Sequence, residues 1–269
     1  MINPIDTPTS RETLIQIFSE SPPVSLLPEL HSGRWSTALS NPRIAKELSL
    51  LMEKADAESA VPLPPLTDKA YREFAATGMR LPFERIYFER RRRLARAAVA
   101  LLAEPDSESR KGSFLEKLED IFSEPSWTLP AHVRNETGRD PFQIGLFSAE
   151  TANLMGECYN VFGAILPQEF KDRIQQRIRQ QFLENYLDPQ REPGWTSIQN
   201  NWNAVCHQGV LGAALSIVDD PELLADLLIK ASRSLPLFLE GYGPDGGCSE
   251  GPSYWEYGFG WFAVLNEQL

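Results

Sequence analysis

Hydrophobic residues recur along most of the chain three and four positions apart, which is the spacing of amphipathic helices. Alternating runs of β-branched and polar residues, which would predict strands, are nearly absent. The helical pattern covers residues 10–18, 41–55, 67–78, 81–105, 107–125, 148–166, 167–187, 200–218 and 220–243, and a last helix begins near 252. The pattern therefore predicts an all-α protein.

Local signals mark where several of these helices begin and end. Ser10 and Thr67 stand where N-caps are expected, and Asn41 precedes a proline at the first helical position. Gly78 and Pro105 stand where helices are expected to stop. These signals agree with the hydrophobic periodicity.

The arrangement of the helices indicates a ring of hairpins. Short turns join the later helices, which makes neighbours antiparallel. The chain has no evident fixed-period repeat, which favours an α/α toroid over a repeat solenoid. We expect one toroid-type domain over 1–269, with N-terminal helices at 1–122 and core helices at 146–269. Because the helical pattern is still running at the last residue, we expect an incomplete toroid from a longer protein.

Composition and charge narrow the classes of protein. Hydrophobic residues make up 42 % of the 269 residues and charged residues 23 %, as in ordinary globular proteins. The net charge of −11 disfavours nucleic acid as a partner. No apolar stretch reaches the ~20 residues that a membrane helix needs. The N-terminus has no visible secretory signal, so we expect a cytoplasmic protein, or a periplasmic one if a signal was removed.

The cysteines and the basic residues give no sign of a metal, cofactor or anion site. The three cysteines are too sparse for a disulfide framework or a zinc site, and we expect no metal and no cofactor. The basic run at 90–93 favours a solvated helix face over an anion site, because Glu89 can pair with Arg93 along the helix.

A polar cluster opens the helix expected at 200–218. Asn200, Asn203 and His207 share one helix face, and Asn201 and Gln208 share a neighbouring one. Amide donors at the positive end of a helix favour a carboxylate ligand. The alternative is that Asn200 is only an N-cap and that the other side chains are hydrogen-bonded core groups.

A second cluster, "PDGGCSEGPSYWEYGFGWF" at 244–262, combines glycines, carboxylates and aromatic rings. The glycines allow a ligand to approach the backbone. Carboxylates can accept hydrogen bonds from sugar hydroxyls, and flat rings can stack on sugars. We expect the side chains of Phe259, Trp261 and Phe262 to lie in the core and Tyr254 to act in function.

Three passages resemble the heparinase II/III-like family of polysaccharide lyases. They are "LFSAETANLMGECYNVFGAIL" at 146–166, "NNWNAVCHQGVLGAAL" at 200–215 and "GPDGGCSEGPSYWEYG" at 243–258. The resemblance implies an α/α toroid followed by a β-sandwich, and cleavage of an acidic, uronate-containing polysaccharide by β-elimination. That reaction needs donors that neutralise the uronate carboxylate, a base for the C5 proton and an acid for the leaving oxygen. Tyrosine suits the acid, since its pKa of ~10 keeps it protonated.

The resemblance also implies roles for individual residues. Asn201 would neutralise the carboxylate, with Asn200 and Asn203 as alternatives, and Tyr254 would be the acid, with Tyr257 as the alternative. Some family members have a histidine after the Asn, where this chain has Trp202, so a histidine base would be His207. The residues expected to bind substrate are Trp195, Asn200, Trp202, Asn203, Glu250 and Tyr257.

Two other functions remain open at this stage. One is a glycoside hydrolase on the same scaffold, with Asp245 or Glu250 as general acid and a second carboxylate as base. The other is a non-catalytic helical array that binds glycans or proteins.

Overall fold

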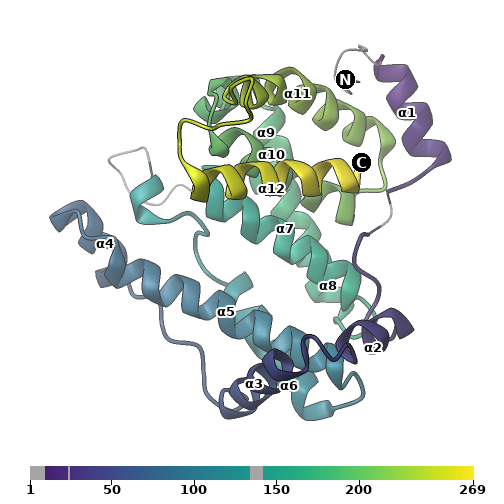
Figure 1. The fold of residues 1–269 in the computed structure, drawn as a ribbon, viewed down its shortest axis with the longest axis vertical. Helices are drawn as coiled ribbons and strands as arrows, with labels where there is room; N and C mark the ends of the chain where they lie inside the picture. The colour runs from purple at the N-terminus through teal and green to yellow at the C-terminus, as the bar shows by residue number, and fades with distance from the viewer. Residues whose placement is uncertain (1–9, 24, 134–141) are drawn as a thin grey trace. The chain divides into compact units, whose positions relative to one another are not determined.

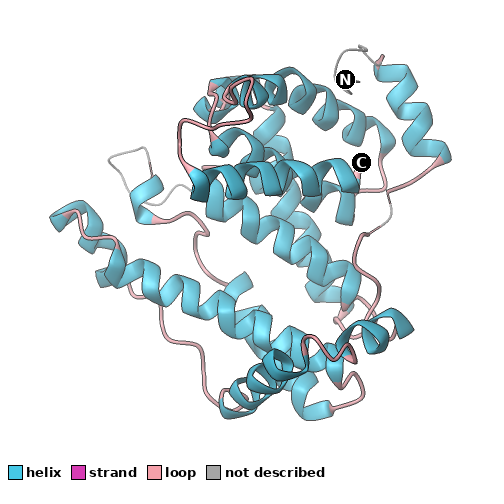
Figure 2. Ribbon diagram, viewed as in Figure 1, coloured by secondary structure: helices cyan, strands magenta, loops and turns pink. Residues whose placement is uncertain are grey.

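In a computed structural model, which describes residues 10–23, 25–133 and 142–269, helices and loops make up these residues and no strand occurs among them (Figures 1 and 2). The all-α prediction is thereby confirmed for this part of the chain. Tyr242 and Cys248 form one isolated antiparallel bridge. Closure of the helices into a toroid stays a prediction.

The described residues form two compact units. The first unit takes its residues from Met1–Leu27, Pro141–Asn160 and Pro167–Leu269, and the second from Pro28–Asp140 and Val161–Leu166. The single domain expected over 1–269, with helices divided between 1–122 and 146–269, stays a prediction. Helix α1 (Arg11–Glu20) belongs to the first unit although it lies near the N-terminus, because it packs on α11 (Pro221–Glu240). Arg11 pairs with Asp226 at 2.6 Å.

The second unit is built around α5 (Leu81–Ala103). Its other helices are α2 (Gly33–Leu39), α3 (Ala45–Ala57), α4 (Asp68–Thr77), α6 (Glu108–Phe122) and a 3₁₀ turn at Pro130–His132. Helix α5 contacts α3 and α6 and buries the apolar face that its periodicity predicts. That buried face carries Phe83, Tyr87, Leu94 and Leu101.

Capping chemistry explains the helix ends of this unit. Thr67 Oγ1 accepts from Ala70 N at 3.2 Å, and Gly78 closes α4 with φ of 74°. The predicted start of the next helix upstream, at Asn41, is wrong, because Asn41 Oδ1 accepts from Arg43 N in a local turn and α3 begins only at Ala45. Helix α2 is not predicted by the sequence pattern at all.

The basic run at 90–93 stabilises the fold. Arg90 is 5 % exposed and its Nε donates to Glu124 at 2.7 Å, while Arg91 donates to the other oxygen of that carboxylate at 2.8 Å. Arg92 and Arg93 both pair with Glu89. The expectation of a solvated helix face is met by Arg92, whose side chain is 57 % exposed, but it is wrong for Arg90, which is buried against Glu124.

The first unit surrounds α10 (Asn201–Ile217), nearly all of whose residues are buried. Its other elements are most of α7 (Leu146–Val161), α8 (Gln168–Ile178), a π-helical turn (Arg179–Leu183), α9 (Glu184–Leu187), 3₁₀ turns at Pro189–Arg191 and Gly194–Ser197, and α12 (Pro252–Gln268). Small residues let the helices approach α10. A Cβ on Gly209 would lie 2.5 Å from the backbone of Ala149, and one on Gly258 would lie 3.2 Å from Cβ of Asn201.

Candidate active site

The N-terminus of α10 is closed by the chain's own groups. Asn200 Oδ1 accepts from Trp202 N at 3.1 Å, as an N-cap does. The Glu250 carboxylate accepts from Asn201 N at 2.8 Å and from Asn201 Nδ2 at 2.7 Å. The positive helix end therefore does hold a carboxylate, as its donors favour, but that carboxylate belongs to Glu250.

A second contact ties α12 to α7. The hydroxyl of Tyr257 donates to the carboxylate of Glu150. Glu150 lies within the 146–166 passage, yet the sequence offers no signal that singles it out, because its partner stands 107 positions away. Together with the Asn201–Glu250 pair, this bond joins segments from all three lyase-like passages.

The loop between α11 and α12 is a formed hairpin. Gly243 N donates to Gly247 O at 2.8 Å, and the Trp255 indole donates to Gly246 O at 2.9 Å. Gly246 and Gly251 have φ of 78° and 90°, a backbone region that favours glycine. The glycines therefore serve the fold of this loop, and the indole holds the loop against α12.

Tyr254 lies in the first turn of α12 and is 51 % exposed. Within the described part of the chain its hydroxyl has no hydrogen-bond partner, unlike that of Tyr257. Of the two tyrosines that the resemblance offers as the acid, Tyr254 is thus the one whose hydroxyl can meet a ligand. Asn200 and Trp202, which are also expected to bind substrate, are half-buried.

Two residues expected at the site lie in the core. Asn203 is fully buried, and its Nδ2 donates to Ser234 Oγ at 3.0 Å and to Ile198 O at 3.1 Å. His207 is also fully buried, with Nδ1 2.9 Å from the hydroxyl of Tyr186. Burial, with a smaller effect of the Lys230 charge, lowers the pKa of His207 to about 3, so the imidazole is neutral. Neither Asn203 nor His207 can therefore contact a substrate.

Trp195 likewise has no surface for a sugar. It is 1 % exposed, its ring stacks on Tyr186 with centroids 6.1 Å apart, and its edge meets His207. The indole donates to Ile144 O at 3.0 Å. Trp195 therefore anchors its loop in the core.

The Asn201–Glu250 pair should stabilise the fold measurably. Glu250→Ala removes the acceptor of both α10 donors, so we expect a loss of about 1.5–3 kcal/mol in the free energy of unfolding. Asn201→Ala removes one bond and should cost about 1 kcal/mol. Urea denaturation of both variants and of the double variant measures the coupling.

The matched control for that cycle is Glu256→Ala, an exposed carboxylate on α12. Its effect should stay within about 0.5 kcal/mol. Equal losses for Glu250→Ala and Glu256→Ala, or additive effects in the double variant, would contradict a specific pairing of Glu250 with Asn201.

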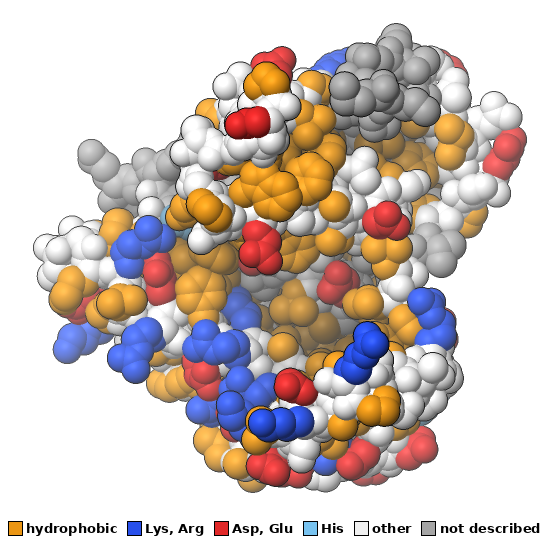
Figure 3. All heavy atoms as spheres, viewed as in Figure 1, with side chains coloured by type: hydrophobic (Ala, Val, Ile, Leu, Met, Phe, Trp, Pro, Cys, Tyr) orange, Lys and Arg blue, Asp and Glu red, His pale blue; other side chains and the backbone are white. Residues whose placement is uncertain are grey.

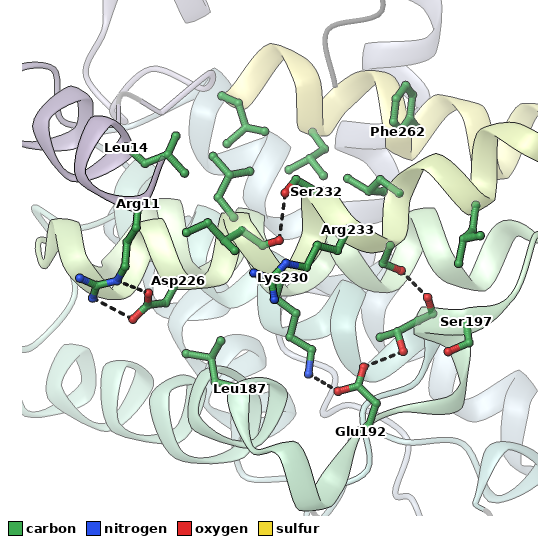
Figure 4. Close-up of a pocket in the computed structure, with 18 of the residues that line it drawn as sticks. Arg11, Leu14, Leu187, Glu192, Ser197, Asp226, Lys230, Ser232, Arg233 and Phe262 are labelled. Atoms are coloured by element: carbon green, nitrogen blue, oxygen red, sulfur yellow. Dashed lines mark hydrogen bonds and ion pairs between the residues drawn. The ribbon is translucent and has the colours of Figure 1, made fainter. Parts of the chain in front are cut away.

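A separate hollow of about 1300 Å³ follows α11 in the first unit (Figure 4). Aliphatic side chains from α1, α11 and α12 line it, and its charges include the pairs Arg11–Asp226 and Lys230–Glu192. None of the residues expected to bind substrate lies among its lining residues. This hollow is therefore a space between helices that is separate from the candidate acid–base residues.

The described residues also bear on metal binding and on membrane insertion. They contain no group of three or more His, Cys, Asp or Glu side chains that could hold a metal ion. None of their helices combines the length and the apolar character needed to cross a membrane.

Comparisons with known proteins assign no role to this site. No model of a protein family matches the chain, and no curated protein matches it either. The lyase-like passages and the contacts among them are therefore what supports a function.

Proposed function

We propose that this protein cleaves a uronate-containing polysaccharide by β-elimination, at a site formed by α10, α12 and α7. One observation carries the proposal: two side-chain contacts, Asn201–Glu250 and Tyr257–Glu150, link segments of the three passages that resemble the lyases. These partners stand 49 and 107 positions apart in the sequence. Because these contacts bring the three passages together, they support one shared site rather than three unrelated sequence similarities.

Tyr254 supplies the proton to the departing oxygen. Its exposed phenol can reach a substrate and donate a proton to it. The Tyr257 hydroxyl is engaged with Glu150, and loss of its proton would place two anions together, which disfavours the reaction. Tyr257 therefore positions Glu150 rather than serving as the acid.

Asn200 is the better donor to the substrate carboxylate. The resemblance implies Asn201 first, but Asn201 is 2 % exposed and Glu250 accepts one hydrogen of its Nδ2. Asn200 is half-buried, and its Nδ2 remains available while Oδ1 caps the helix. With His207 enclosed, the C5 proton goes to the carboxylate of Glu150, and Tyr254 gives its own proton to the departing oxygen.

A glycoside hydrolase is the second candidate, favoured by one feature. Glu150 and Glu250 are two carboxylates held by side-chain donors, one by Tyr257 of α12 and the other by Asn201 of α10, and a hydrolase needs two carboxyl groups. No cationic side chain pairs with Glu250 in the part of the chain that the structure describes.

Product analysis tests both candidates. The purified protein is incubated with sulfated and unsulfated uronate polysaccharides, and ultraviolet absorbance and reducing ends are followed together. Elimination yields both signals, because the new chain end carries an unsaturated uronate. Reducing ends without absorbance would support the hydrolase, and the absence of both signals across the panel would contradict catalysis by this chain.

A further inference from the structure

An aromatic surface lies on α12 beside the candidate site. Trp255 and Phe259 are 40 % and 39 % exposed, and Tyr254 precedes Trp255 in the sequence. Figure 3 shows hydrophobic side chains gathered over this helix. Single exposed hydrophobic residues are ordinary, but two large rings stacked on each other at the surface of one helix form a patch that indicates binding. The expectation that Phe259 lies in the core is wrong.

The rings of this surface are held in place. Trp255 and Phe259 stack with centroids 5.4 Å apart and planes 20° from parallel. Tyr242 meets both rings edge-on, at 6.5 and 6.0 Å. The Trp255 indole is fixed by its bond to Gly246 O. A ligand that stacks here loses little affinity to the ordering of these side chains, because they are already ordered.

The charge around the rings is negative. Residues 241–269 contain Asp245, Glu250, Glu256 and Glu267 and no lysine, arginine or histidine. Asp245 belongs to the hairpin that Trp255 holds, and Glu256 adjoins Trp255 in the sequence. Carboxylates accept hydrogen bonds from hydroxyl groups and repel sulfates and other anions.

We infer that Trp255 and Phe259 form a subsite for an uncharged sugar ring next to the uronate that the acid–base site cleaves. The apolar C–H face of a pyranose matches the π-face of an aromatic ring, and its hydroxyls match the surrounding carboxylates. The substrate class is then a polysaccharide in which uronate units alternate with unsulfated, uncharged sugars. This inference rests on the proposed function for its choice of a polysaccharide.

A binding experiment tests the subsite separately from catalysis. The full chain carrying Tyr254→Phe, which suppresses turnover, is titrated with a hyaluronan oligosaccharide, with the same oligosaccharide after chemical sulfation, and with N-acetylchitohexaose. We expect the two unsulfated sugars to bind and the sulfated one to bind at least about tenfold more weakly. Adding Trp255→Ala or Phe259→Ala should weaken binding about tenfold, and Trp255→Phe should restore much of it.

Phe142→Ala is the matched control, because Phe142 has the same 39 % exposure as Phe259 and lies away from α12 in the sequence. Its affinity should be unchanged. Sugar binding that does not depend on Trp255, tighter binding of the sulfated chain, or no binding of either unsulfated sugar would overturn the subsite. The subsite would also be overturned if the protein self-associates and Trp255→Ala abolishes this association without changing the affinity for sugar. Trp255-dependent binding without any elimination would leave the subsite standing and remove the proposed function.

Discussion

Tyr254→Phe lowers the rate of elimination about 10²–10⁴-fold, the usual contribution of a general acid or base. The change removes one hydroxyl and keeps the ring, so affinity for the polysaccharide should change little. The free energy of unfolding should stay within about 0.5 kcal/mol, because that hydroxyl has no hydrogen-bond partner in the described part of the chain. Initial rates from ultraviolet absorbance and urea denaturation measure the two effects.

Tyr257→Phe is the matched control, one helical turn further along α12. It removes the bond to Glu150, so we expect a stability loss of about 1–3 kcal/mol and a smaller fall in rate than for Tyr254→Phe. A Tyr254→Phe enzyme with the full rate would refute the assignment of the acid. If Tyr257→Phe alone abolished turnover, the role of acid would pass to Tyr257.

The sequence predicts the helices well because their signals are local. Thr67 caps α4 and Gly78 ends it, and both act on neighbours within the same turn. The error at Asn41 is local too, since an asparagine before Pro-Arg caps a helix and a turn by the same kind of hydrogen bond. The short helix α2 has no buried residue, so it carries little hydrophobic periodicity from which it could be predicted.

The candidate site is only partly predictable for a different reason. Helical spacing predicts Asn200, Asn203 and His207 on one face, but it does not say what each side chain meets: Asn200 caps the helix, whereas Asn203 and His207 are buried. The sequence from Ala204 to Ala214 is apolar or small on nearly every side, a pattern typical of a buried helix, and this feature argues for a core His207. The partnership of Glu150 with Tyr257 arises only when distant helices pack.

Lowering the pH should destabilise the protein through His207. Its pKa is about 3 in the folded protein and near 6.5 in an unfolded chain, so below pH 6.5 the unfolded state binds a proton that the native state does not. Stability is therefore lost as the pH falls, with a slope that approaches about 1.4 kcal/mol per pH unit, or about 2 kcal/mol in total between pH 6.5 and 4.5. Urea denaturation across this range measures the slope.

His207→Asn removes the titrating group and keeps a side chain that can bond the Tyr186 hydroxyl. This variant should be less stable than the wild type at pH 7.5, and the difference should shrink as the pH falls. The matched control is His31→Asn, at an exposed histidine, whose free energy of unfolding should change with pH in parallel with that of the wild type. The pKa of His132 is also lowered by burial, to about 4, but His132 is present in all three proteins and its effect cancels.

Parallel curves for the wild type and His207→Asn would show that His207 is not a buried neutral group, and would return it to consideration as the base. The same point bears on the rate of elimination. An enclosed imidazole with a pKa of about 3 gives no step in the pH–rate profile near 6.5, whereas a histidine base at the surface would give one.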